Sequence, residues 1–310
     1  MLKKLARDGL NSEISTVKAL LQSAIDYGDI VGELQLKHRV NELGRELENL
    51  NKNSQIDNSA SVALFFGGKP VLGSKGIAAE FAGVALEQFQ NLISKAFATN
   101  EVKELGTRGK VPFKENSNLM VTGLARGSFG FVLNEMSNQT QLESSELVHI
   151  IDNVALLLRD TAAQDEAVFE ALLDDLDPRM LLALKDFFAN LDNSKATLRI
   201  VEKELDMTLD GAAIHRAKTR TEATSIEEKT SQIEGVLVGF LPEHKKFELR
   251  DKTGKIIYGS ASKEAVEQFN KSEQNPLGRS CLINASVKTV VPLNRSPKDV
   301  VRLVEFLTPH

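Results

Sequence analysis

The pattern of apolar residues near the start of the chain predicts two amphipathic helices. Between residues 11 and 25, apolar side chains recur every three or four positions, after an Asn-Ser pair of the kind that caps a helix. A polar stretch at residues 26–29 interrupts the pattern. A second, heptad-like series follows in a strongly charged segment, at Leu36, Val40, Leu43, Leu47 and Leu50. We therefore expect a helical hairpin or short coiled coil over residues 1–56.

The leucine series of the second helix must pack on another apolar surface. One interpretation is that it packs on the rest of the chain, and the other is that it docks to a second copy or to a partner helix. Three heptads are short for a free-standing coiled coil, so the pattern alone does not separate the two.

Residues 57–228 predict an α+β domain with a small antiparallel sheet. An apolar run at 61–66, a glycine-rich turn and a short strand at 71–72 indicate a hairpin. An amphipathic helix is expected over 78–98, followed by a strand pair at 118–123 and 127–135. Two hairpins on either side of one long helix favour a sheet with one face covered.

The rest of this domain reads mainly as helix. The helical pattern continues to about residue 191, with a break near Asp177-Pro178. A strand is expected over 196–205, and then a helix that begins at Asp210-Gly211 and carries Arg216 and Arg220.

Residues 229–310 predict a small β-barrel. Strands are expected at 234–241, 245–250 and 255–260, then a short helix at 262–270, and two more strands at 280–291 and 299–307. This order is typical of an OB-type barrel, although SH3-like barrels give a similar pattern. The fold class expected is thus α+β, with an N-terminal helical hairpin, a central antiparallel sheet with helices and a C-terminal OB/SH3-like barrel.

Composition is that of an ordinary globular protein. The chain has 310 residues, 42% of them hydrophobic and 26% charged, which favours more than one domain. No apolar run is long enough to cross a bilayer, and the first residues do not form a secretory leader, so we expect a cytoplasmic protein without a membrane partner. The single cysteine, Cys281, lies in an apolar stretch and is expected to be a small core residue.

Charge is distributed unevenly around a net value of −5. From residue 232 to the end there are 12 Lys and Arg against nine Asp and Glu, whereas residues 143–192 hold 12 acids and three bases. An anionic partner would therefore prefer the C-terminal end.

An OB barrel used in the usual way would bind its ligand across the second and third strands and between the first and last loops. The residues expected to contact phosphates there are Lys246, Arg250, Lys252, Arg295 and Lys298, and Tyr258 is the one good stacking platform. The case for nucleic acid as the ligand is weaker, because stacking needs exposed aromatic side chains and the chain has no Trp and only two Tyr. Phe247 alternates with Leu249, which places it on the expected core face.

Motifs for catalysis, metals and cofactors are incomplete. The glycine-rich segment 126–132 lacks the lysine strand and the other signatures of a kinase, so its glycines are assigned to a turn. Lys69 and Lys75 stand beside turn glycines without a P-loop motif and are candidates for anion binding only. The five histidines are isolated from one another, so no metal site and no cofactor are predicted.

These patterns predict a non-enzymatic binding or scaffold protein that works in a larger or self-associated assembly, with a protein or a second copy as partner. The alternative is an accessory factor associated with nucleic acid, for example in a bacterial-type defence or nucleic-acid-processing complex, which uses the barrel together with Arg216 and Arg220. A third reading is an enzyme whose site leaves no linear motif.

Overall fold

The computed structural model describes residues 3–52, 59–102, 109–125, 129–135, 145–203, 205–272, 276–291 and 296–309. The chain divides into two compact units. The first comprises Met1–Lys103, Lys110–Ala162 and Asp186–His215, and the second comprises Glu104–Gly109, Ala163–Lys185 and Arg216–His310.

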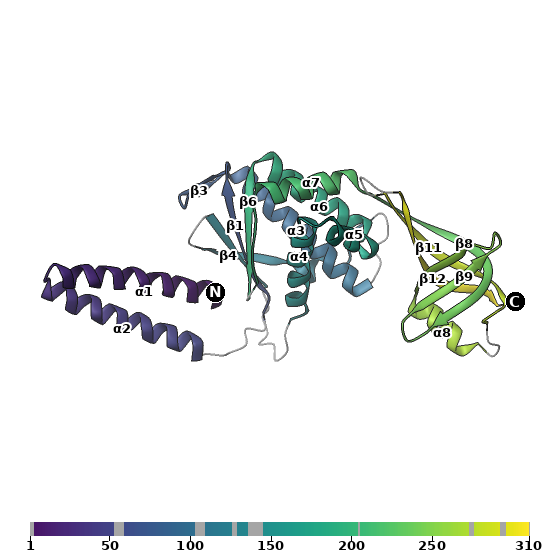
Figure 1. Cartoon of the computed structure of the whole chain (residues 1–310), viewed down its shortest axis with the longest axis horizontal. Helices are drawn as coiled ribbons and strands as arrows, with labels where there is room; N and C mark the ends of the chain where they lie inside the picture. Colours follow the sequence, from purple (N-terminus) through teal and green to yellow (C-terminus); the bar gives the residue numbers. More distant parts are fainter. Residues whose placement is uncertain are drawn as a thin grey trace. The chain divides into compact units, whose positions relative to one another are not determined.

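Two antiparallel helices form the N-terminal hairpin, α1 (Lys3–Asp26) and α2 (Ile30–Lys52) (Figure 1). Gly28 adopts a left-handed φ of 70°, which lets the chain reverse, and the Asp29 carboxylate accepts a hydrogen bond from the Gly32 N–H at the start of α2. Both predicted helices are therefore confirmed. The predicted cap at residues 11–12 is wrong, because α1 begins at Lys3 and carries these two residues in its interior.

The first unit contains a five-stranded antiparallel sheet in the order β4-β5-β1-β6-β7. Its strands are β1 (Ser61–Gly68), β4 (Leu119–Ala125), β5 (Phe129–Glu135), β6 (Ala196–Glu202) and β7 (Leu205–Leu209).

Two details of this sheet differ from the sequence-based expectation. The short strand β2 (Val71–Leu72) pairs with β3 (Gly76–Ile77) and not with β1, because both edges of β1 are already occupied by β5 and β6. The single strand expected at 196–205 is instead the hairpin of β6 and β7, which turns next to Lys203 with its positive φ of 42°.

Helices cover one face of the sheet in the first unit (Figure 1). On this face Phe66 of β1 packs edge-on against Phe81 of α3 (Ala79–Val102), with ring centroids 5.4 Å apart. A 3-10 turn, η1 (Lys114–Ser117), follows α3. The long helical stretch expected beyond residue 141 is three helices, α4 (Glu146–Thr161), α5 (Glu166–Asp175) and α6 (Pro178–Asn193), and α7 (Gly211–Ala223) comes after β7.

The opposite face of the sheet is covered in part by the start of α1. Phe65 of β1 is buried there, with Leu5 of α1 packed against its cluster. The Arg199 guanidinium lies 5.2 Å from the Phe65 ring centroid and makes two hydrogen bonds of 2.8 Å to Asp206, which Lys4 of α1 also approaches at 3.5 Å. The hairpin is therefore joined to the sheet by both apolar and ionic contacts.

The second unit contains a ring of five strands. These are β8 (Ser225–Leu241), β9 (Lys246–Asp251), β10 (Ile256–Ala261), β11 (Ser280–Val291) and β12 (Lys298–Pro309), with α8 (Lys263–Lys271) between β10 and β11. The predicted order of strands and helix is confirmed, although β8 begins at Ser225 and not at residue 234. Neighbouring strands run β8-β9-β10-β12-β11 and back to β8, and only the β10–β12 pair is parallel.

The interior of the ring is apolar. Phe247 and Leu249 are buried in it, as their alternation predicts, and Cys281 is buried there too, where burial raises the pKa of its thiol. Gly259 lies where β10 meets β12, and a Cβ at this position would collide with the Val301 carbonyl oxygen and the Phe247 ring. Ring closure therefore requires glycine at position 259.

We predict that Gly259→Ala lowers the free energy of unfolding by about 2 kcal/mol, because the added methyl group must push apart two paired strands. Gly239→Ala is the matched control, since the nearest atoms to a Cβ there are at an ordinary 3.5 Å. Denaturant unfolding of both variants checks this. Equal stability of the two would show that the β10–β12 approach is not as tight as described.

A buried carboxyl group, that of Glu202, makes the first unit sensitive to pH. Glu202 of β6 is only 1% exposed, and its Oε1 has no hydrogen-bond partner among the described residues. The pKa of Glu202 is raised from 4.5 to about 8, mainly by burial and secondly by a hydrogen bond with Asp152. The folded chain therefore holds a proton that the unfolded chain releases above about pH 4.5.

We predict that the folded state loses stability, by a few kcal/mol at most, as pH rises from about 4.5 to about 8. Glu202→Gln should flatten this dependence, because the amide keeps a donor toward Asp152 and cannot ionise. Thermal unfolding at about pH 5 and about pH 8 measures the effect. If the wild type and Glu202→Gln lose Tm equally over this interval, Glu202 is not the responsible group.

Candidate functional site

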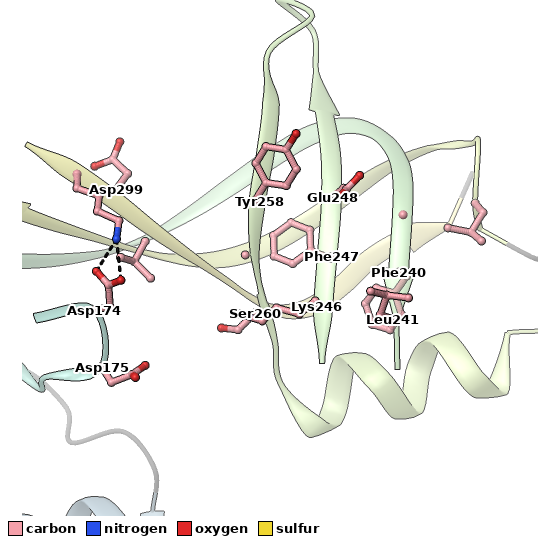
Figure 2. A pocket seen from close by; sticks show the side chains of 15 residues that line it. Asp174, Asp175, Phe240, Leu241, Lys246, Phe247, Glu248, Tyr258, Ser260 and Asp299 are labelled. Carbon is pink, nitrogen blue, oxygen red and sulfur yellow. Dashed lines mark hydrogen bonds and ion pairs between the residues drawn. The ribbon is translucent and has the colours of Figure 1, made fainter. Parts of the chain in front are cut away.

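A hollow of about 830 Å³ lies in the second unit, on the side of the strand ring formed by β8, β9, β10 and β12 (Figure 2). The carboxyl end of α5 closes one border of it through Asp174 and Asp175. Leu277, in the segment before β11, contributes another part of its lining.

The floor of the hollow is apolar. Phe240 and Phe247 belong both to its lining and to the core of the ring, and Phe240 stacks on Phe269 of α8 at a centroid distance of 4.3 Å. Leu241 and Val300 extend the apolar surface toward the rim. The floor is thus part of a packed core, which gives the site a rigid base.

Alternation along β9 and β10 places polar and aromatic side chains over this floor. Because Phe247 and Leu249 point inward, Lys246 and Glu248 point outward. Tyr258 of β10 is the direct cross-strand neighbour of Glu248, and it is 64% exposed. Figure 2 shows the Tyr258 ring and the Glu248 side chain on adjacent strands.

Acidic groups outnumber basic ones around the hollow. Four carboxylates, those of Asp174, Asp175, Glu248 and Asp299, line it together with two lysines, Lys246 and Lys298. In the described part of the chain, the carboxylates of Glu248 and Asp175 form no hydrogen bond and no ion pair. The described lining therefore carries a net negative charge, although the C-terminal segment as a whole is basic.

Lys298 is held by the acidic end of α5. Its Nζ lies 2.7 Å from both carboxylate oxygens of Asp174. The dashed lines in Figure 2 mark these two interactions at the labelled Asp174. Lys288 of β11 donates to the Asp174 carbonyl oxygen at 2.9 Å; burial lowers the pKa of Lys288, and the nearby Asp175 and Asp174 oppose this shift. Two lysines thus fix α5 beside the strands, and Lys298 is neutralised in doing so.

The structure brings together three of the six residues predicted to bind nucleic acid. Lys246, Tyr258 and Lys298 line the hollow. Arg250 lies on the exposed side of β9 outside the lining, and Lys252 pairs with Glu234 at 2.5 Å. Arg295 lies outside the described residues.

The other predicted candidates lie elsewhere. At Lys69 and Lys75, the backbone N–H groups that an anion would need already donate to Lys195 and Leu72 carbonyl oxygens. The leucine series of α2 is buried or half-buried on the side toward α1, with Leu43 fully buried, and its role in docking a partner stays a prediction. This series consists of Leu36, Val40, Leu43, Leu47 and Leu50.

Two arginines of α7 that the nucleic-acid hypothesis included are part of the fold of the second unit. Arg220 is 5% exposed, donates to Glu166 at 2.6 and 2.9 Å and to the Ala163 carbonyl oxygen at 2.6 Å, and lies 5.5 Å from the Phe169 ring centroid. Arg216 donates to the same Ala163 carbonyl oxygen at 3.0 Å. Arg220 is therefore inaccessible to a phosphate backbone.

Sequence reasoning missed the acidic side of the site. Asp174 and Asp175 precede β9 by some seventy residues, and only folding brings them to the ring. The acidic excess of residues 143–192 was the available signal, but a count of charges does not say which strand these acids will face.

No metal centre is defined by the described residues, where three or more His, Cys, Asp or Glu side chains never gather in a metal-binding arrangement. None of the described helices is both long and apolar enough to span a bilayer. Comparison with family models, curated proteins and solved structures gives no match.

We predict that Arg220→Lys lowers the free energy of unfolding by about 1 to 3 kcal/mol, because an ammonium group cannot replace the fork of bonds to Glu166 and Ala163. Arg250→Lys, on the exposed side of β9, is the control and should be neutral. Denaturant unfolding followed by circular dichroism compares the two. A neutral Arg220→Lys would contradict the structural role assigned to this side chain.

Proposed function

We propose that the protein is a non-enzymatic binding protein whose C-terminal strand ring recognises an extended polypeptide segment with cationic side chains. The observation that supports this proposal most strongly is the rim of the hollow. There the exposed Tyr258 ring adjoins the unengaged carboxylate of Glu248 above an apolar floor, with Asp175 and Asp299 nearby.

We further propose that the ring is an OB-type barrel. Numbered along the chain, its strands are neighbours in the order 1-2-3-5-4-1, the third and fifth strands are parallel, and a helix precedes the fourth. OB barrels bind ligands across strands two and three, which here are β9 and β10. Lys246, Glu248 and Tyr258 belong to these two strands.

The chemistry of the rim fits a guanidinium or ammonium group better than a phosphate. A cation over the Tyr258 ring is worth about 0.5 to 2 kcal/mol, and an exposed ion pair with Glu248 adds about 0.2 to 1 kcal/mol. A phosphate would instead meet an excess of carboxylates, with Lys298 already bound to Asp174. Micromolar affinity corresponds to about 8 kcal/mol, so apolar side chains of the peptide must also contact the floor.

No reaction is assigned to the hollow. The described residues of its lining include no His and no Cys, and neither of their hydroxyl groups, on Tyr258 and Ser260, has a neighbouring imidazole base among them. Binding is therefore the activity that these residues support.

We predict that a short labelled peptide alternating Arg and Leu binds the full chain at least tenfold more tightly than the matching peptide of Glu and Leu, as measured by fluorescence anisotropy. Tyr258→Ala and Glu248→Gln should each weaken binding several-fold, because they remove the ring and the charge that face the cation. Tyr27→Ala and Glu80→Gln are the controls, since each removes the same kind of exposed group at a position in the first unit. Equal binding of the two peptides would reject the proposal.

Nucleic acid is the second candidate, favoured by the exposed Lys246 and Arg250 on β9. Under this alternative, single-stranded DNA or RNA binds more tightly than the Arg-Leu peptide, and Lys246→Glu and Arg250→Glu abolish the binding. The same anisotropy assay at low and high salt measures this. Tight, salt-dependent binding of an oligonucleotide that these two variants abolish would replace the peptide proposal.

A further inference from the structure

Large apolar side chains are exposed at the tip of the N-terminal hairpin. Among the described residues 20 large hydrophobic side chains are exposed, and six of them fall within fifteen consecutive positions. These six, which we call the hairpin tip, are Leu20 (53% exposed), Ile25 (44%), Tyr27 (89%), Ile30 (80%), Val31 (67%) and Leu34 (73%). Large apolar side chains exposed close together in this way mark interaction sites.

The seam between α1 and α2 divides the hairpin into two flanks. Glu13 precedes the half-buried seam residue Ile14 by one position, and Arg39 precedes Val40 in the same way. The ion pair of 2.7 Å between Glu13 and Arg39 shows that they lie on the same flank. Lys18 follows the seam residue Val17 by one position and Lys37 follows Leu36, so both lie on the opposite flank. Residues seven positions apart lie on the same side of a helix, so Ile25 lies on the same flank as Lys18, and Ile30 on the same flank as Lys37.

Charged groups on and around this second flank are ordered along the hairpin axis. Asp26 and Asp29 lie at the turn, and Lys18 lies about 14 Å below it on α1, at 1.5 Å per residue. Lys18, Asp26 and Asp29 form no ion pair within the described chain. Lys37, about 12 Å below the turn on α2, bonds to Glu33 at 2.5 Å. An acidic band at the turn is thus followed by a basic band farther down, in which Lys18 carries the uncompensated charge because Lys37 is already paired with Glu33.

We propose that two copies of this chain associate through this flank, with their hairpins antiparallel and overlapping by about 15 Å, so that a four-helix bundle forms at the overlap. Leu34 lies about 7.5 Å below the turn, at the middle of the overlap, and therefore meets Leu34 of the second copy. Lys18 comes level with Asp26 of the second copy, and Lys37 comes level with the turn that carries Asp29. Two-fold symmetry repeats each of these contacts.

Two observations favour a second copy as the occupant. The acidic and basic bands are complementary to each other when one hairpin is inverted, which is the property that an isologous interface needs. The carboxylates of Asp26 and Asp29 at the turn form no ion pair within the described chain, and their charge opposes burial of the tip in lipid. The exposed apolar area is below the roughly 800 Å² per partner of a standard interface, so the dimer is reversible, with micromolar affinity.

Sedimentation velocity of the full chain over a range of concentrations tests the association. We expect a monomer–dimer equilibrium, and Leu34→Glu should raise its dissociation constant at least tenfold. Leu72→Glu is the matched control, because Leu72 is a leucine of equal exposure, 72%, outside the hairpin. Leu34 is preferred to the seam residue Leu43, which is fully buried and whose replacement would disrupt the hairpin itself.

Cysteine cross-linking tests the geometry. Leu34→Cys should form a disulfide-linked dimer under mild oxidation, since the two side chains meet at the symmetry axis, whereas Leu72→Cys should not. The background is low because Cys281, the only native cysteine, is buried.

A charge exchange tests the register. Lys18→Glu and Asp26→Lys should each weaken the dimer several-fold at low salt, and the double variant Lys18→Glu/Asp26→Lys should restore it, because the exchanged charges face each other again. Circular dichroism of each variant confirms that the helices are retained.

A chain that stays monomeric at high micromolar concentration and low salt overturns the inference, and so does a dimer that Leu34→Glu leaves unchanged. A dimer in which Leu34→Cys forms no cross-link contradicts the proposed overlap of the two hairpins, because another face of the hairpin then forms the contact. The inference does not depend on peptide binding by the hollow. Tyr258→Ala should leave the dimer intact and Leu34→Glu should leave peptide binding intact, so the two proposals fail separately.

Discussion

The parallel pairing of β10 with β12 is the constraint on which the candidate site depends. It closes the strand ring and thereby sets Val300 and Lys298 of β12 beside Tyr258 and its neighbours on β10. The strands can approach this closely because residue 259 is glycine, since any side chain there would meet the Val301 carbonyl oxygen. A backbone requirement in the core thus determines which side chains share the hollow.

The charge of the site follows from a second consequence of that closure. Once β12 is in place, Lys298 reaches the carboxylate of Asp174, and Lys288 of the adjacent strand reaches its backbone carbonyl. These contacts hold α5 at the border of the hollow. They also neutralise Lys298, one of the two lysines that line the hollow. Part of the positive charge of the C-terminal segment therefore forms contacts within the second unit and is not available to a ligand.

Local patterns were sufficient for the elements and insufficient for their partners. The helix α2, the inward side of Phe247 and Leu249, and the order of strands and helix along the C-terminal segment all depend on neighbours in sequence, and each was predicted correctly. The pairing of β2 with β3 depends instead on β5 and β6 having taken both edges of β1, and these strands come from residues 129–135 and 196–202. No short segment carries that information.

The same distinction explains the site. Tyr258 could be selected from the sequence because an exposed aromatic residue on a strand is a local feature, whereas the acids that surround it come from α5 and from alternate positions of β9 and β12. A count over residues 232–310 finds a basic segment, but the ligand experiences only the charges within a Debye length, about 10 Å at moderate salt. Among the described residues that line the hollow carboxylates are in excess, so the choice between a cationic peptide and a nucleic acid depends on tertiary structure and not on the net charge of the segment.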